Sequence, residues 1–149
     1  MPDMGVDVTT EIVIDRPVEQ VAAYAGDPGT APEWYVNIRS IDWKTPPPAA
    51  VGSQMDFVAH FLGRRMAYTY EIVELVPCKR LVMRTVDGPF PMETSYRWES
   101  LEGGKTHMTL RNRGEPRGFS KLVAPIMTAA MRRANEKDLA RLKQRLEES

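Results

Sequence analysis

Polar and apolar residues alternate along most of the chain with the period of two that is typical of half-buried strands. The first such run is Val6–Ile14, and the others lie between residues 36 and 115. Short turns join most of these runs, and short turns force neighbouring strands to be antiparallel. We therefore expect a seven-stranded antiparallel sheet. Its further strands are expected at Val36–Lys44, Gln54–Leu62, Arg65–Val76, Arg80–Val86, Pro91–Leu101 and Lys105–Glu115.

Two short segments after the first strand carry helical spacing instead. Asp15 stands where the N-cap of a helix over Val18–Ala25 would lie. The segment Gly26–Gly29 breaks this helix, and Ala31–Tyr35 has room for one more helical turn. We expect two short helices between the first and second strands.

The last segment, Phe119–Glu148, places apolar residues close to the i, i+3, i+4, i+7 positions of one long amphipathic helix. Pro125 has no backbone N–H to donate, so we expect this helix to start late or to kink near residues 122–125. A strand, two short helices, a six-stranded meander and a long helix form the segregated order of an α+β fold. We expect one domain over residues 1–149.

The alternation also indicates which side chains face the interior. On Pro91–Leu101 one face is aromatic and the other is charged, so the aromatic face is expected to be covered. A twisted meander curls, and a single helix cannot fill its concave face. The methionines on that face suit either an irregular filled core or a ligand cavity. The candidate ligand-binding residues are Trp34, Phe57, Met66, Tyr68, Tyr70, Met83, Met92, Thr94, Tyr96, Trp98, Met108, Leu110, Asn112, Met127 and Met131.

Few of these interior positions could support catalysis. A tyrosine hydroxyl such as that of Tyr70 or Tyr96 could donate to a developing enolate, while Asn112 orients a substrate carbonyl. The alternative is that each polar side chain forms a hydrogen bond with a backbone group of a neighbouring residue.

Asp138 is a further candidate, because it lies within the apolar stripe of the long helix and is expected to point toward the sheet. The alternative is an ion pair with Arg111, Arg141 or Lys137. Asn135 carries the same ambiguity.

Composition and motifs exclude several classes of partner. The chain has 20 Lys and Arg against 20 Asp and Glu, a balance that favours neither nucleic acid nor an anionic membrane. His60 and His107 fall on the solvent face with no cysteine or carboxylate at ligand spacing, so no metal site is expected. Nucleotide-binding and hydrolase motifs are missing from the sequence, so no cofactor is expected.

The single cysteine, Cys78, excludes an internal disulfide and fits a reducing compartment. No run approaches the roughly 18 uncharged residues of a membrane span, and no targeting signal is recognised. We expect a cytoplasmic protein.

Six segments follow one another in an order that is typical of a known family: IVIDRPVEQVAAYAGDP, the pair Trp34-Tyr35, VGSQMDFVA, YEIVELVPCKRLVMR, YRWESLEGGKTHMTL and LARLKQRLEE. The chain resembles the START-like, or SRPBCC, superfamily and its polyketide cyclase/dehydrase-like branch. The resemblance implies the helix-grip fold, in which the sheet wraps around the C-terminal helix and leaves a ligand cavity. Members are carriers, sensors, cyclases or hydrolases of hydrophobic small molecules, and these segments do not choose among those roles.

Three functions remain open. The first is binding or carriage of a small hydrophobic molecule, which could be a lipid, a polyketide or an aromatic compound. The second is a cofactor-free polyketide cyclase or dehydratase, a lyase or isomerase. The third is a structural or protein-interaction module whose own side chains fill the cavity. The sequence is compatible with a monomer or a homodimer.

Overall fold

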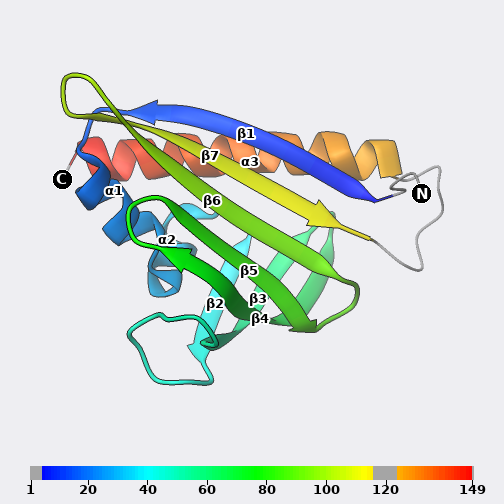
Figure 1. The fold of residues 1–149 in the computed structure, drawn as a ribbon. Helices are drawn as coiled ribbons and strands as arrows, with labels where there is room; N and C mark the ends of the chain where they lie inside the picture. Colours follow the sequence, from blue (N-terminus) through cyan, green and yellow to red (C-terminus); the bar gives the residue numbers. More distant parts are fainter. Residues whose placement is uncertain (1–4, 116–123, 149) are drawn as a thin grey trace.

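A curved antiparallel sheet wraps around a long helix in the computed structural model (Figure 1). The structure describes residues 5–115 and 124–148. The strands follow the spatial order β1-β7-β6-β5-β4-β3-β2, and every neighbouring pair is antiparallel. They are β1 Val6–Ile14, β2 Ile38–Trp43, β3 Gln54–Phe61, β4 Arg64–Val76, β5 Arg80–Asp87, β6 Met92–Leu101 and β7 Lys105–Gly114. The helices are α1 Val18–Ala25, the 3-10 turn η1 Pro28–Thr30, α2 Ala31–Trp34 and α3 Ala124–Glu147.

This arrangement confirms the predicted α+β helix-grip fold, with strand ends that differ by one or two residues. The largest change is at β2, which begins at Ile38 rather than Val36. The N–H of Val36 donates to the side chain of Asp138 on α3, 2.8 Å away, and so takes no part in strand pairing.

The N-terminal ends of α1 and α3 differ from the predictions or lie partly outside the described residues. Asp15 does not cap α1, because Pro17 is the N-cap residue and its carbonyl accepts the N–H groups of Gln20 and Val21. Residues 119–123 of the predicted long helix lie outside the described residues, and the described part runs over Ala124–Glu147.

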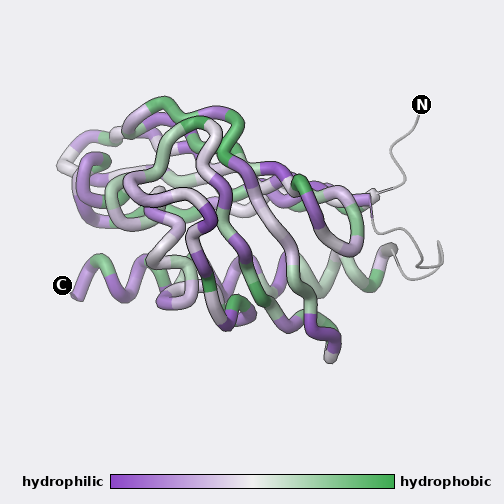
Figure 2. Tube along the Cα trace, turned by 90° about the horizontal axis from the view of Figure 1, so that it is seen from below, coloured by the Kyte–Doolittle hydropathy of each residue, from purple (hydrophilic) through white to green (hydrophobic). Residues whose placement is uncertain are grey.

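Helix α3 lies along the sheet beside β1, and green and purple stretches alternate along the helix (Figure 2). Its C-terminal half packs tightly, since Leu139, Leu142 and Leu146 are buried in the main hydrophobic core together with side chains of α1 and α2. Full burial of each such leucine contributes roughly 1.5 to 3 kcal/mol. Toward its N-terminus, Met127 joins a smaller cluster with Val6 and Val8 of β1. The two ends of α3 are therefore packed to different degrees.

The pairing of β6 with its neighbours sets the interior surface. Thr94 lies opposite Met83 on β5 and Asn112 on β7, and Tyr96 lies opposite Leu81 and Leu110. Side chains on alternate positions share a face, so these residues form one continuous layer toward α3. The sheet therefore presents aromatic and polar residues together on its concave side.

The turn between β3 and β4 has strained backbone geometry. Phe61 pairs with Arg64, so the loop consists of Leu62 and Gly63 alone. Both have positive φ, 52° and 76° respectively, as a two-residue hairpin turn of type I′ requires. A leucine in this region is strained, because its Cβ approaches the following carbonyl. Leu62 is also 51% exposed.

Replacing Leu62 with asparagine should therefore stabilise the fold. Asparagine tolerates positive φ, and Asn-Gly is the preferred pair for this turn, so we expect the free energy of unfolding to rise by about 1 kcal/mol. Urea denaturation of Leu62→Asn against wild type measures this. A less stable variant would show that contacts of the leucine side chain outweigh the backbone strain.

Candidate functional site

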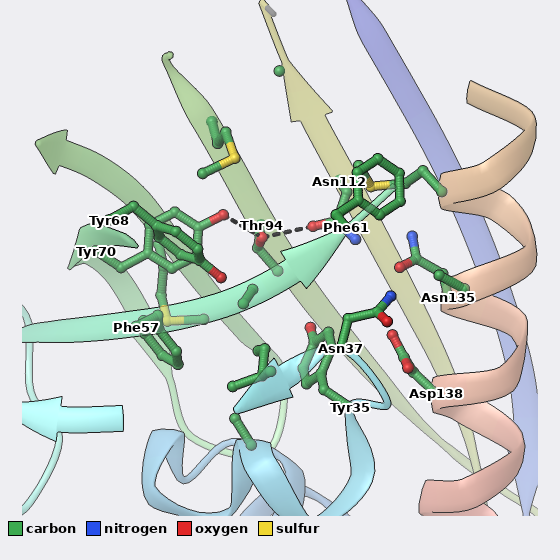
Figure 3. Close-up of a pocket in the computed structure, with 18 of the residues that line it drawn as sticks. Tyr35, Asn37, Phe57, Phe61, Tyr68, Tyr70, Thr94, Asn112, Asn135 and Asp138 are labelled. Carbon is green, nitrogen blue, oxygen red and sulfur yellow. Dashed lines mark hydrogen bonds between the residues drawn. The ribbon is translucent and has the colours of Figure 1, made fainter. Parts of the chain in front are cut away.

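A cavity of about 120 Å³ lies between the concave face of the sheet and α3 (Figure 3). Its wall extends from Val6 and Met127, at the smaller hydrophobic cluster, to Tyr96, in the main core. Most of the lining side chains are apolar or aromatic. The cavity therefore occupies the space where the single helix leaves the curved sheet incompletely filled.

Most of the candidate ligand-binding residues line this one cavity. Those that do are Phe57, Met66, Tyr68, Tyr70, Met83, Met92, Thr94, Tyr96, Asn112, Met127 and Met131. The candidate catalytic residues Tyr70, Tyr96, Asn112 and Asp138 are all among its lining residues.

Four candidate ligand-binding residues do not line the cavity. Trp34 is fully buried, with its ring centroid 4.3 Å from that of Tyr35 and 5.8 Å from that of Tyr96. Trp98 packs edge-on against Tyr96 from the other side, at 5.9 Å. Met108 and Leu110 are fully buried in the main core. These side chains belong to the packed core beside the cavity.

The sequence interpretation also missed part of the lining. Tyr35 belongs to the aromatic pair that it quoted as structural, and Asn37 lies in the link between α2 and β2. Asn135 also lines the cavity, and its place in the apolar stripe of α3 is the sequence signal that indicates it. Phe61 continues the apolar face of β3, and period-two alternation identifies it.

A chain of hydrogen bonds crosses the sheet at one end of the cavity. The hydroxyl of Thr94 donates to Oδ1 of Asn112 at 2.6 Å. Thr94 has only one hydroxyl hydrogen, so at 2.7 Å it must accept the hydroxyl of Tyr70. Figure 3 shows this chain along β4, β6 and β7. The hydroxyl hydrogens of Tyr70 and Thr94 and the amide oxygen of Asn112 are therefore all used within this chain.

The tyrosines of the wall keep their protons at neutral pH. Burial raises the pKa of Tyr70 to about 12 and raises the pKa values of Tyr35, Tyr68 and Tyr96 as well. Tyr35 and Tyr96 share one hydrogen bond of 2.7 Å between their hydroxyl oxygens. These phenols can donate hydrogen bonds, but they are not bases.

Three polar side chains meet on the other side of the cavity, and we call Asn37, Asn135 and Asp138 the polar corner. Asn135 and Asp138 project from α3 in the direction of Asn37, which reaches over from the link before β2 (Figure 3). Asn135 is 3% exposed and Asp138 is 2% exposed. The amide nitrogen of Asn135 is buried and has no hydrogen-bond partner among the described residues.

Asp138 does not form the ion pair that the alternative interpretation required. Arg111 instead forms two hydrogen bonds with Asp7 on the outer face, at 2.7 and 2.9 Å. Within the described part of the chain, Asp138 makes no ion pair with Lys137 or Arg141. Its Oδ1 accepts the Val36 N–H.

Burial raises the pKa of Asp138 from its usual 3.8 to about 7, although the Val36 N–H and the charge of Arg141 both lower it. The phenols of Tyr35 and Tyr96 lie near enough to be affected by its charge in turn. The carboxyl group is thus able to gain or lose a proton near neutral pH.

A second hollow on the surface adjoins the cavity. It lies between the β3–β4 turn and α3, and Leu62, Arg133 and Lys137 border it. The two hollows share Asn37, Phe61 and Ala134 in their walls. The side chain of Phe61 therefore stands between the interior cavity and an open groove.

Sites of two other classes are not found among the described residues. No group of three or more histidine, cysteine, aspartate or glutamate residues could hold a metal ion there. None of the helices in residues 5–115 and 124–148 has the length and apolarity needed to cross a membrane.

Solved structures show the same fold. A START superfamily protein from Mycobacterium smegmatis is 14% identical, with a TM-score of 0.81 over 95% of this chain and 97% of its own. The protein TTHA0849 from Thermus thermophilus is 21% identical, with a TM-score of 0.81 over 94% and 96%. The Zhui aromatase/cyclase from Streptomyces is 13% identical, with a TM-score of 0.80 over 96% and 94%. At these identities the likeness concerns the fold alone.

The sequence comparison is more specific. No curated protein matches the chain. Residues 5–147, however, match the family described as polyketide cyclase / dehydrase and lipid transport. This match includes every strand, every helix and the whole cavity wall. The chain therefore belongs to the polyketide cyclase/dehydrase and lipid transport family.

Proposed function

We propose that this protein binds and carries a small hydrophobic or aromatic molecule in the cavity between the sheet and α3. The observation that supports this is the cavity itself, a mostly apolar hollow of about 120 Å³ within a single domain. A dry apolar cavity of about 150 Å³ is known to accept benzene, so the size suits a molecule with one ring. Larger members of the ligand class would need the wall to move.

The composition of the wall favours such a ligand. Phe57 and Tyr68 stack nearly parallel, with ring centroids 5.6 Å apart, and Tyr70 meets both edge-on. Aromatic walls of this kind pack well against another ring. Met66 and Met83 add unbranched side chains that adapt to different apolar shapes. The filled-interior alternative has less support, because these side chains leave space between them.

The groove beside α3 is the route of access that this proposal implies. Phe61, Asn37 and Ala134 separate the groove from the cavity, and rotation of one aromatic side chain is a small movement. Carriage requires a ligand to enter and leave without unfolding. The thin wall at Phe61 supplies a route for that.

Filling the cavity should abolish binding without unfolding the domain. Ala59 is buried on β3 and lines the cavity, so Ala59→Phe places a phenyl ring in the space that a ligand would occupy. We expect at least a tenfold loss of affinity for propylbenzene by isothermal titration calorimetry, because a filled cavity has no apolar surface to offer.

The matched control is Ala67→Phe, which adds the same ring at an exposed position of the neighbouring strand. It should bind propylbenzene as wild type does. Equal affinity in Ala59→Phe and wild type would contradict the proposed binding site.

A second function, a cofactor-free cyclase or dehydratase, is favoured by one observation: the carboxyl of Asp138, whose pKa is about 7, lines the same cavity as the amide of Asn112. A carboxylate that titrates near neutral pH can accept and return a proton, and an amide donor can polarise a carbonyl. Deuterium exchange into a small β-diketone, followed by NMR in wild type and Asp138→Asn, tests this function. Exchange no faster than in buffer would count against it.

The protonation of Asp138 also makes a prediction about stability. The folded state holds this proton more tightly than the unfolded chain, so stability from this group is greatest at low pH and is lost as pH rises through about 7. Asp138→Asn keeps an acceptor for Val36 without a charge. Its free energy of unfolding relative to wild type should therefore rise by roughly 2 kcal/mol between about pH 5 and about pH 8.

Urea denaturation at both pH values measures this difference. Glu136→Gln removes an exposed carboxylate from the same helix and should lack the rise. A pH-independent difference for Asp138→Asn would show that the carboxyl is ionised throughout this range.

A further inference from the structure

The polar corner contains hydrogen-bonding capacity that the described residues leave unused. The amide nitrogen of Asn135 is buried without a partner among them, and the residue is only 3% exposed. A buried donor without a partner destabilises the fold, so its presence at a cavity wall calls for an explanation. A ligand atom that accepts a hydrogen bond there would remove the penalty.

The carboxyl of Asp138 supplies the complementary acceptor. Its Oδ1 is occupied by the Val36 N–H at 2.8 Å, which holds the group in place. Its second oxygen has no hydrogen-bond partner among the described residues. Asn135 and Asp138 are three residues apart on α3, so they lie on the same face with side chains close to each other. The pair therefore offers one donor and one acceptor on the same side of the cavity.

The other polar groups of the cavity offer less. In the chain of Tyr70, Thr94 and Asn112, both hydroxyl hydrogens and the amide oxygen are already used. Asn112 is also partly exposed, so water can satisfy its amide nitrogen. The polar corner differs from this chain, because an unused amide donor and an unused carboxyl oxygen lie there on neighbouring positions of α3.

We infer that the ligand is an aromatic molecule with a neutral hydroxyl group, which donates to Asp138 and accepts from the amide of Asn135. This inference rests on the proposed binding function and adds the chemical class of the ligand. A hydroxyl has one hydrogen to donate and lone pairs to accept, which is what the pair requires. An ether lacks the donor. A carboxylate lacks the donor too and meets the negative charge of Asp138 in a buried place.

The groups around Asp138 agree with a neutral partner. Arg141, the cation whose charge lowers its pKa, lies on the solvent side of the same helix. The neighbouring groups from the α2 end and from β6 are the neutral phenols of Tyr35 and Tyr96. An anionic ligand would therefore meet the carboxyl without a cation between them.

The remaining basic residues near the cavity are placed elsewhere. Arg133 and Lys137 border the outer groove. Arg113 reaches the cavity wall from β7, but its guanidinium pairs with Glu93 of β6 at 3.4 Å. None of these three cations is placed to balance the negative charge of an anionic ligand at the polar corner.

The test uses four compounds of one shape: propylbenzene, para-propylphenol, para-propylanisole and para-propylbenzoate. Their dissociation constants are measured by isothermal titration calorimetry at about pH 8, at which Asp138 is mostly ionised. We expect the phenol to bind about tenfold tighter than the anisole, because a hydrogen bond to a charged group is among the stronger ones. The benzoate should bind more weakly than all three neutral compounds.

Two variants identify the groups responsible. Asn135→Leu keeps the size of the side chain and removes its donor, so the preference for the phenol over propylbenzene, which has no oxygen to accept that hydrogen bond, should fall by about threefold or more. Asp138→Asn keeps an acceptor for Val36 and replaces the second oxygen with a donor, so it should increase affinity for the benzoate. Glu136→Gln, an exposed change on the same helix, should alter neither preference.

The comparison within wild type decides the inference even if a variant fails to fold. If propylbenzene binds but the phenol and the anisole bind equally well, the inference is wrong and the proposed binding function stands. If none of the four compounds binds, both are wrong.

Discussion

The structure depends on the mismatch between a curved seven-stranded sheet and the one helix that lies against it. Helix α3 packs closely through Leu139, Leu142 and Leu146, and this contact holds α1, α2 and the sheet together. Farther toward its N-terminus, Met127 is the one hydrophobic side chain of α3 that is buried among the described residues, within a much smaller cluster. Tight packing at one end and sparse packing at the other leave a cavity beside the middle of the helix.

This mismatch also explains why polar residues occur inside. Asn135 and Asp138 lie on α3 between the two clusters. In a well-packed apolar core, burial of these polar side chains would destabilise the fold. Beside a cavity they can face space that a ligand or water occupies. The bond from the Val36 N–H to Asp138 then ties the link before β2 to α3 and delays the start of the strand. One buried carboxyl group therefore holds the link before β2 against α3 and also lines the cavity.

Much of this was predictable from the sequence. The alternation of β6, with Thr94, Tyr96 and Trp98 on one face and charged residues on the other, identified the concave surface. The helical stripe correctly placed Asp138 toward the sheet. Periodicity reports which face a residue occupies, but not how far along a curved sheet the helix covers that face. For this reason Trp98 and Met108, which share the inner face with the lining residues, were expected in the cavity but are packed in the main core beside it.

Other features depend on contacts between distant segments. The partner of Asp138 is a backbone N–H 102 positions away in the sequence, in a link without regular structure. Local spacing pointed instead to nearby cations, because ion pairs are the partners that a helical pattern can suggest. Asn37 was missed for the same reason. Contacts made by loops carry no periodic signal, although here they form part of the candidate site.

The central claim is that the space between the sheet and α3 accepts a small apolar molecule, and the methionines provide the most direct test. Their methyl groups can be labelled with carbon-13 and followed by NMR during titration with propylbenzene. Met66, Met83, Met92, Met127 and Met131 line the cavity, whereas Met55 and Met108 are fully buried outside it. The account predicts saturable shifts for the cavity-lining methyl groups and little change for the other two. Unchanged cavity-lining methyl signals at saturating propylbenzene would contradict it.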